Sequence, residues 1–164
     1  MNTRRIEPGP GQESVWDYPR PPALQHCERH VEVFFNNILI ADSSNVVRVL
    51  ETSSPPVYYI PESDIEMKFL EENSHKTFCE WKGVAHYYDL KVHDRTALRA
   101  AWHYPDPVPE FGGLKNHIAF YAQKMDRCFV DGEIVKAQSG DFYGGWITSD
   151  IVGPFKGEPG TEGW

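Results

Sequence analysis

The sequence predicts a mainly β protein, a compact antiparallel sheet domain with one or two short helices. Two observations predict this fold class: short apolar and β-branched runs recur at close spacing, and Gly, Pro and Asn residues separate them. The length of 164 residues suits one domain, and 40% hydrophobic with 24% charged residues is the composition of an ordinary globular protein.

The first predicted strands form a hairpin. Apolar residues alternate in Val31–Phe35, and Ile38–Ala41 follows a two-residue turn at Asn36-Asn37. Asparagine tolerates the positive φ that such turns require. Val46–Leu50 and Val57–Ile60 are expected to be the next two strands, because both are rich in β-branched or aromatic residues.

One short helix is predicted at residues 64–72. Ser63 and Glu66 have the spacing of a capping box, and Ile65 and Phe69 form an apolar pair one helical turn apart. Residues 96–102 are ambiguous, because their Ala and Leu content favours a helix whereas the segments around them favour strands.

Two further hairpins are predicted in the second half of the chain. Thr77–Trp81 and Val84–Val92 are expected to pair around a turn at Lys82-Gly83. The strongest hairpin signal is Asp131-Gly132 between two short apolar runs, because this pair suits a type I′ turn.

Both ends of the chain are rich in proline and glycine, which weaken helices and sheets. We expect an N-terminal arm over residues 1–30, a single β domain over residues 31–150 and a C-terminal arm over residues 151–164. Each arm carries large aromatic rings, Trp16 and Trp164 among them. Burial of these rings would hold the arms against the domain.

The charge balance limits the classes of partner. With 16 Lys and Arg against 24 Asp and Glu, the net charge of −8 argues against broad binding to nucleic acid or to an anionic membrane. The longest run without a charged residue is Thr52–Pro61, far short of the roughly 20 apolar residues of a membrane helix. No secretory signal follows Arg4-Arg5. A cytoplasmic protein is expected, with a homodimer as an open alternative.

Cysteine usage favours reduced thiols. The three cysteines are an odd number, lie far apart and have no CxxC spacing. We expect no metal and no cofactor, because the only local group of ligand-type residues, His26-Cys27 with His30, is typical of a polar loop. Cys79 and His86 flank a predicted turn, so a reactive thiol–imidazole pair is one hypothesis and a buried inert thiol is the other.

Several familiar motifs are absent from the sequence. It has no G-x-S-x-G elbow, H-E-x-x-H helix, phosphate-binding G-x-x-x-x-G-K-[ST] loop or G-x-G-x-x-G fingerprint. The glycine pairs Gly112-Gly113 and Gly144-Gly145 are expected to mark bends or the close approach of a ligand.

Charged residues lie among aromatic residues in two segments. Alternation in a strand would place Glu80 and Lys82 on one face, where they would bind an anion or act as acid and base; the alternative is a surface ion pair. The proline-bounded loop at residues 101–107 contains Trp102 and Tyr104. These rings would either form a rigid wall for a ring-containing ligand or plug the end of the sheet.

Seven sequence blocks occur in one order within residues 31–148. They are I-A-D-S from residue 40, V-L-E from 49, P-x-Y-Y-I-P from 56, T-x-C-x-W-K-G-x-A-x-Y from 77, A-W-x-Y-P from 101, I-A-F-Y from 118 and Y-G-G-W-I-T from 143. Together they resemble the DUF427 family, whose defining domain has no known function. The proline-rich start and the glycine-rich end resemble its longer bacterial members.

The resemblance implies a β-tent (Mss4-like) fold, as in methionine sulfoxide reductase B. Relatives with that fold often hold zinc between two CxxC knuckles, which this chain lacks. The resemblance also carries a nucleotidyltransferase label. It implies a shared pocket of polar and aromatic residues: Arg48, Glu51, Tyr58, Tyr59, Lys82, Tyr87, Trp102, Tyr104, Tyr121, Asp126, Tyr143 and Trp146.

Three functions remain open from the sequence. The first is binding of a small polar or anionic ligand in an aromatic pocket, oriented by Arg48, Glu51 and Lys82. The second is an enzyme, a hydrolase or transferase, with Glu51 or Glu80 as general base and Lys82 as electrostatic stabiliser. The third is a protein-interaction module anchored by the aromatic arms. The first two need these charged residues and Trp102 to meet in one cleft.

Overall fold

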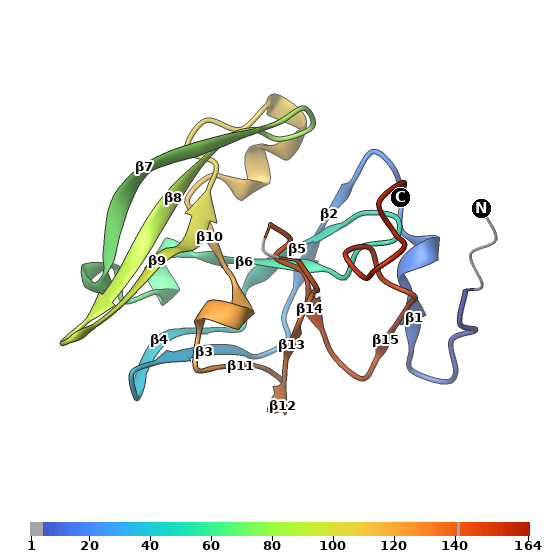
Figure 1. The fold of residues 1–164 in the computed structure, drawn as a ribbon, viewed down its shortest axis with the longest axis horizontal. Coiled ribbons are helices and arrows are strands. Elements are labelled where there is room, and N and C mark those ends of the chain that lie inside the picture. The colour runs from blue at the N-terminus through green and yellow to red at the C-terminus, as the bar shows by residue number, and fades with distance from the viewer. Residues whose placement is uncertain (1–4, 141) are drawn as a thin grey trace.

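The structure is a computed structural model that describes residues 5–140 and 142–164 (Figure 1). Its strands are β1 (Glu13–Ser14), β2 (Ala23–Cys27), β3 (Val31–Phe35), β4 (Ile38–Ser43), β5 (Val46–Leu50), β6 (Val57–Pro61), β7 (Leu70–Cys79), β8 (Gly83–Val92), β9 (Arg95–His103), β10 (His117–Phe120), β11 (Arg127–Val130), β12 (Glu133–Ile134), β13 (Lys136–Ala137), β14 (Trp146–Ile147) and β15 (Ile151–Val152). The helices of the described residues are short 3₁₀ turns: η1 (Val15–Asp17), η2 (Glu62–Asp64), η3 (Met67–Phe69), η4 (Pro109–Leu114) and η5 (Ala122–Lys124).

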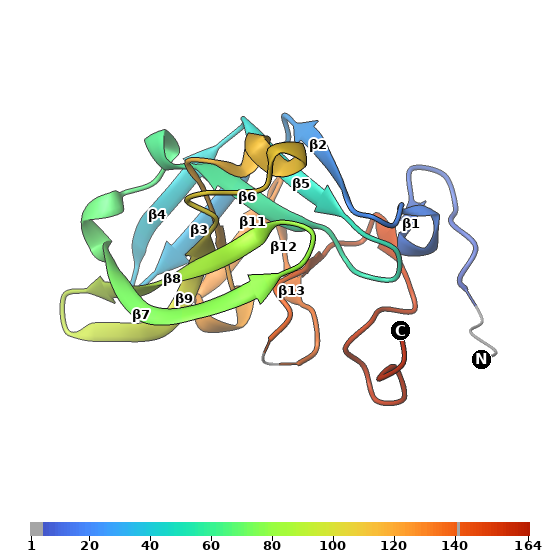
Figure 2. The ribbon, with the colours of Figure 1, turned by 90° about the horizontal axis from the view of Figure 1, so that it is seen from above.

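Two sheets build the molecule. The larger has seven antiparallel strands in the order β2-β5-β6-β10-β9-β8-β7, and the smaller has four in the order β12-β11-β3-β4. The smaller sheet lies below β6 in Figure 1, while β7, β8 and β9 extend as long curved strands on the left; Figure 2 shows the same strands from above. The prediction of a mainly β, antiparallel fold is therefore confirmed, and the β-tent assignment stays a prediction.

The first hydrophobic core fills the space between the two sheets. Val31, Val33 and Phe35 of β3 are almost fully buried in it, because they share one face of the strand, and Glu32 and Phe34 lie on the other, partly exposed face. Tyr58 and Ile60 of β6 contribute from the large sheet.

A second core lies on the other face of the large sheet. Its members from β6 are Val57 and Tyr59, the alternate positions to those in the first core. Phe111 and Leu114 of η4 cover part of this face. The large sheet is thus apolar on both faces.

The predicted hairpins are confirmed. Asn36 and Asn37 join β3 to β4 with φ of 51° and 63°, and Asp131 joins β11 to β12 with φ of 50°. These are the left-handed values that a two-residue hairpin turn needs. In the hairpin of β7 and β8, Glu80 and Lys82 lie in the turn itself, so they do not share a strand face as predicted.

The predicted helix at residues 64–72 is wrong. The segment forms the end of η2, then η3, and continues into β7. Ile65 bridges to Ala41, and the Glu66 amide donates to the carbonyl of Ile40. Pairing with β4 therefore takes up the backbone groups that a helix would have used.

The ambiguous residues 96–102 belong to a strand. β9 pairs with β8 on one side and with β10 on the other. Ala100 and Ala101 are fully buried there, Ala101 opposite Tyr88 and Phe120. Packing between large neighbours outweighs the helix propensity of alanine.

Both ends of the described chain pack onto the domain. β1 pairs with β15 in parallel, and the rings of Trp16 and Trp164 lie 5.0 Å apart. A third core of Val15, Tyr18, Leu50 and Ile151 lies beside this contact. β2, inside the predicted arm of residues 1–30, pairs with β5 along its length and forms one of the two edges of the large sheet. Among the described residues, no helix has the length and apolar character needed to cross a bilayer.

Candidate functional site

The outer face of the large sheet carries a cleft of about 300 Å³. Its floor consists of five aromatic side chains, Tyr59, Tyr87, Trp102, Tyr104 and Tyr121, and we call it the aromatic cleft. They come from β6, β8 and β9 and from the residues directly after β9 and β10. Because side chains alternate along a strand, the residues beside them in β6 and β8 face the first core instead.

Trp102 is at the centre of the floor. Its ring lies 4.5 Å from that of Tyr121 and packs edge-on against Tyr59 at 6.2 Å. Its indole N–H donates to the Tyr59 hydroxyl at 3.1 Å. Tyr87 is directly opposite Trp102 in the pairing of β8 with β9. These contacts fix the rings before any ligand arrives, so little side-chain freedom is left to lose on binding.

The phenols of the floor stay protonated at neutral pH. Burial raises the pKa of Tyr59, Tyr104 and Tyr121 well above the ordinary value of a phenol. A buried phenolate would lack the hydration that stabilises its charge. The Tyr121 hydroxyl uses its proton in a hydrogen bond to the carbonyl of Phe142 at 3.1 Å, and none of the three phenols acts as a base.

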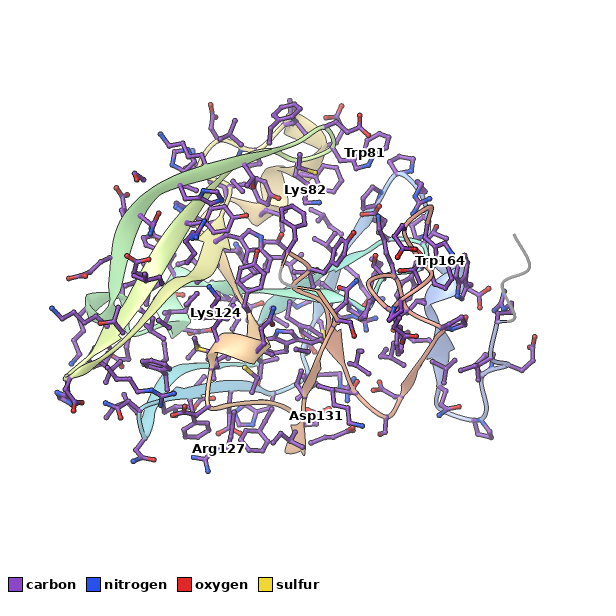
Figure 3. All side chains as sticks on the ribbon, viewed as in Figure 1. Trp81, Lys82, Lys124, Arg127, Asp131 and Trp164 are labelled. Atoms are coloured by element: carbon purple, nitrogen blue, oxygen red, sulfur yellow. The ribbon has the colours of Figure 1, made fainter. Side chains whose placement is uncertain are left out.

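Charged side chains stand at the rim of the cleft. Lys82, in the turn between β7 and β8, places its ammonium 5.9 Å from the ring of Tyr104, and Lys156 places its own 5.6 Å from the ring of Tyr143. Both lysines are half-buried, and neither forms an ion pair with a described residue. Figure 3 shows Lys82 beside Trp81 at this turn.

The two acidic residues of the rim are less available to a ligand than the lysines are. The Glu51 carboxylate lies 3.7 Å from the guanidinium of Arg20, and Glu80 is exposed in the turn beside Lys82. Arg20 and Glu51 form a partly exposed pair, and such pairs contribute roughly 0–1 kcal/mol. The rim can therefore present two cations, Lys82 and Lys156, to a ligand. Of the two carboxylates among the described lining residues, Glu51 is partly buried and Glu80 is exposed.

Gly144 forms part of the wall because its backbone passes directly over Trp102. A Cβ atom at this position would overlap the six-membered ring of Trp102. At Gly145 a Cβ would meet the Gln138 side chain at 2.6 Å and the Pro55 carbonyl at 2.7 Å. Neither glycine has a positive φ, so this pair serves close packing against the protein and does not form a bend.

Comparison with known families identifies the relationship. Residues 23–131 match the family described as a domain of unknown function, DUF427. The chain belongs to the DUF427 family. The match begins at β2 and ends in the turn after β11, so the DUF427 region holds the whole large sheet and the floor of the aromatic cleft. No curated protein matches the chain.

Most of the predicted site residues line the cleft of the DUF427 domain: Glu51, Tyr59, Glu80, Lys82, Tyr87, Trp102, Tyr104, Tyr121 and Tyr143. Arg48, Tyr58, Asp126 and Trp146 lie elsewhere. The wall beyond residue 131, which includes Tyr143 and Lys156, is outside the matched region.

Arg48 does not reach the cleft, although the sequence predicts it there. It alternates with Val49 in β5, so its side chain points to the opposite face. The guanidinium donates to Gln25 at 2.7 Å and to Glu13 at 2.8 Å. Arg48 thus links β1 to the β2–β5 edge of the large sheet and is unavailable to a ligand.

Tyr58, Trp146 and Asp126 also lie outside the cleft, and each contacts other parts of the protein. Tyr58 stacks on Trp146 at 5.2 Å within the first core, and the Trp146 indole donates to the carbonyl of Phe120. Asp126 binds the Arg95 guanidinium at 2.6 Å, far from the cleft. Partial burial raises the pKa of Asp126, but hydrogen bonds from Arg95 and from a backbone amide outweigh it and leave the pKa below its usual range.

Cys79 and His86 lie on different faces of the large sheet. Cys79 lines the aromatic cleft, whereas His86 lies 5.9 Å from His103 on the other face. The structure therefore does not bring thiol and imidazole together. No group of three or more His, Cys, Asp and Glu side chains suited to a metal ion occurs in residues 5–140 and 142–164.

Sequence reasoning missed the part of the site contributed by distant segments. Lys156 comes from the C-terminal segment, and Gln138 from the loop before β14; Gln138 donates to the carbonyl of Lys156 at 2.7 Å. No motif surrounds either residue, so only the tertiary fold reveals them.

Proposed function

We propose that this DUF427 protein binds a small molecule that combines a ring with a polar or anionic group. The observation that carries the proposal is the aromatic cleft itself, about 300 Å³ of space over a floor of aromatic rings with two half-buried lysines at its rim. Small-molecule sites typically combine apolar walls with a few polar groups in this way.

The chemistry of the lining favours a ring with an anionic group. Trp102 and Tyr104 give the cleft an apolar floor that packing already holds in place, so a bound ring would cost little side-chain entropy. Lys82 and Lys156 attract negative charge, and the phenols of the floor stay neutral and so do not repel it. Partly buried lysines interact more strongly with an anion than lysines on an open surface, because the effective dielectric is lower.

The test compares three probes: benzoate, its uncharged analogue benzyl alcohol, and acetate, which has no ring. Isothermal titration calorimetry should show benzoate binding tightest. Lys82→Gln and Lys156→Gln should each weaken benzoate about fivefold and leave benzyl alcohol unchanged.

Lys115→Gln is the matched control, because Lys115 is exposed and lies away from the cleft. It should leave benzoate binding unaltered. The proposal fails if acetate binds as tightly as benzoate, or if the two rim variants behave like the control.

An enzyme remains the second candidate, because Glu51 and Lys82 line the same cleft. A hydrolase or transferase would use Glu51 or Glu80 as base and Lys82 to stabilise developing negative charge. Turnover of an ester or phosphoester probe by the native protein would favour it. The interaction-module hypothesis has less support, since the arm rings Trp16 and Trp164 pack on each other.

A further inference from the structure

A second cavity, of about 400 Å³, adjoins the aromatic cleft. Tyr87, Tyr121 and Phe142 line both spaces. The other side chains around it are His75 of β7, Arg99 of β9, and Gln123 and Lys124 of η5. We call it the basic cavity, because its charged lining residues, among those described, are all cationic side chains or histidine.

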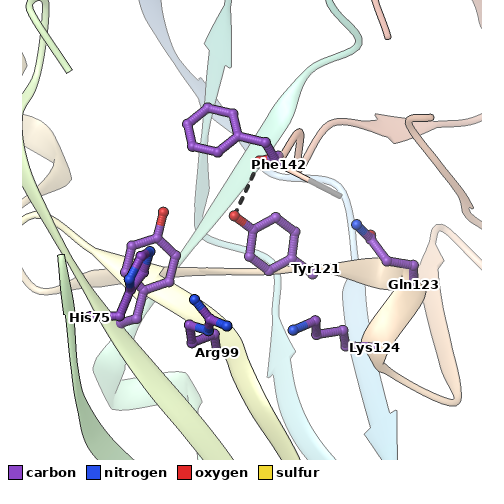
Figure 4. Close-up of a pocket in the computed structure, with 7 residues that line it drawn as sticks. His75, Arg99, Tyr121, Gln123, Lys124 and Phe142 are labelled. Carbon is purple, nitrogen blue, oxygen red and sulfur yellow. Dashed lines mark hydrogen bonds between the residues drawn. The ribbon is translucent and has the colours of Figure 1, made fainter. Parts of the chain in front are cut away.

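Two cationic groups converge in this cavity. Figure 4 shows the Arg99 guanidinium and the Lys124 ammonium directed toward the same space beneath Tyr121. Lys124 donates to the carbonyl of Leu98 at 2.6 Å and lies 6.0 Å from the Tyr121 ring. Neither cation forms an ion pair with a described residue. Like charges repel at short range, so this arrangement is stabilised when an anion occupies the space between them.

The backbone holds Arg99 in place by specific contacts. Arg99 has a φ of 49°, a left-handed value that is uncommon for residues other than glycine. Its amide donates to the Asp89 carboxylate at 2.8 Å, and the same oxygen accepts from the Asn73 side chain. The pairing of β8 with β9 shifts register here. Such irregularities redirect side chains and recur next to binding sites.

We propose that the basic cavity binds a phosphate-type oxyanion, and that with the aromatic cleft it forms one site for a ring-bearing phosphate ester. Arg99, Lys124 and Gln123 supply donors from two elements on different sides of the space. A tetrahedral oxyanion accepts from several directions, and the planar fork of arginine matches it. The shared rings of Tyr87 and Tyr121 make the two spaces neighbours. The ring half of this inference rests on the proposed function of the cleft.

Inorganic phosphate tests the basic cavity alone. A titration of the full chain at constant ionic strength, followed by the Nε–H resonances of arginine in ¹H–¹⁵N spectra, should saturate. Arg99→Gln and Lys124→Gln should each weaken binding about tenfold. Arg127→Gln is the matched control, because Arg127 lies on the smaller sheet, away from the cavity (Figure 3). Non-saturable shifts, or equal losses in the control, overturn the phosphate site.

Phenyl phosphate then tests the joint site. It should bind about tenfold more tightly than inorganic phosphate, because the ring adds contacts with the cleft. Equal affinity of the two probes, with phosphate binding intact, overturns the joint site and counts against the proposed function of the cleft. Benzoate binding in the cleft, together with phosphate affinity unchanged by Arg99→Gln, overturns only the basic-cavity proposal.

Discussion

Residue 144 must be a glycine because any Cβ atom there would overlap the ring of Trp102. The two residues are distant in sequence, yet the glycine backbone lies against the indole ring in the wall of the aromatic cleft. Interiors are packed so closely that even one methyl group in such a place must displace its neighbours.

We expect Gly144→Ala to lower the free energy of unfolding by about 1–3 kcal/mol, because the new methyl group would overlap a fixed ring. Gly112→Ala is the matched control. A methyl group at Gly112 would have no neighbouring atom within 4 Å, and the residue has no positive φ, so its change should stay within about 0.5 kcal/mol. Urea-induced unfolding measures both, and equal effects would show that Trp102 does not constrain residue 144.

The sequence alone could not reveal this role. A pair of glycines predicts a bend or the close approach of a ligand, and nothing nearby in the chain points to a tryptophan in β9. The same holds for Arg48. Its charge and the family resemblance suggested the cleft, but the direction of its side chain depends on which face of β5 is turned outward.

Among the elements, the hairpin of β11 and β12 carries the clearest electrostatic signature. Asp131 in its turn binds the Arg29 guanidinium at 2.8 Å and accepts from the amide of His30. The hydrogen bond from Arg29, supported by the one from His30, lowers the pKa of Asp131 below its usual range. Its carboxylate therefore stabilises the folded state above the unfolded pKa near 3.9, and this contribution is lost as the pH falls through the folded pKa.

Asp131→Asn should destabilise the protein at pH 7 by about 1 kcal/mol or less, because the pair is half exposed. Asparagine keeps the positive φ of the turn, so the change reports the charge. The difference from the native protein should shrink between pH 7 and pH 2, because the native carboxyl gains its proton as the pH falls through the folded pKa. Denaturant unfolding at both pH values checks this.

Asp94→Asn provides the comparison, since Asp94 is exposed in the turn between β8 and β9. It should behave like the native protein at both pH values. A loss in Asp131→Asn that is as large in acid as at pH 7 would contradict the electrostatic explanation.

Elements with local turn signals could be predicted from the sequence, and elements decided by distant partners could not. The hairpins at Asn36-Asn37 and Asp131-Gly132 were predictable because the turn residues themselves supply the conformation. The segment around Glu66 has a genuine capping pattern, but its amide is taken by Ile40, which lies far away in the chain. Local propensity loses wherever such tertiary pairing is available.

At the scale of the whole molecule, the first residues of the described chain are part of the folded domain. Glu13 accepts from Arg48 at 2.8 Å and from the Tyr18 hydroxyl at 2.6 Å. The side chain of Arg48 is only 6% exposed, whereas that of Glu13 is 40% exposed. The buried member of such a pair suffers most when its partner changes.

Glu13→Gln should lower the free energy of unfolding by about 1–2 kcal/mol, because the amide still accepts a hydrogen bond but no longer neutralises Arg48. Glu7→Gln, at an exposed position in the same arm, should cost less than about 0.5 kcal/mol. Thermal unfolding of both variants separates the two cases. Matching losses would mean that the buried pair contributes nothing beyond the general charge of the arm.

Part of the candidate site could be predicted from the sequence, and part could not. Family motifs and the clustering of charge among rings pointed to Lys82, Trp102 and their neighbours, which the fold brings together. They did not point to Arg99 or Lys124, which come from segments without a motif and converge only because β9 and η5 meet beside Tyr121.

Some residues that line the aromatic cleft belong to strands, and others belong to a turn or a loop. Tyr59 and Trp102 are anchored in strands, whereas Glu80 and Lys82 occupy a turn and Phe142 a loop. Turns accept replacement far more readily than paired strands. A library randomised only at residues 80–82 and 142–143 should therefore retain the scaffold while yielding variants that select different small molecules, which makes this domain a starting point for engineered receptors.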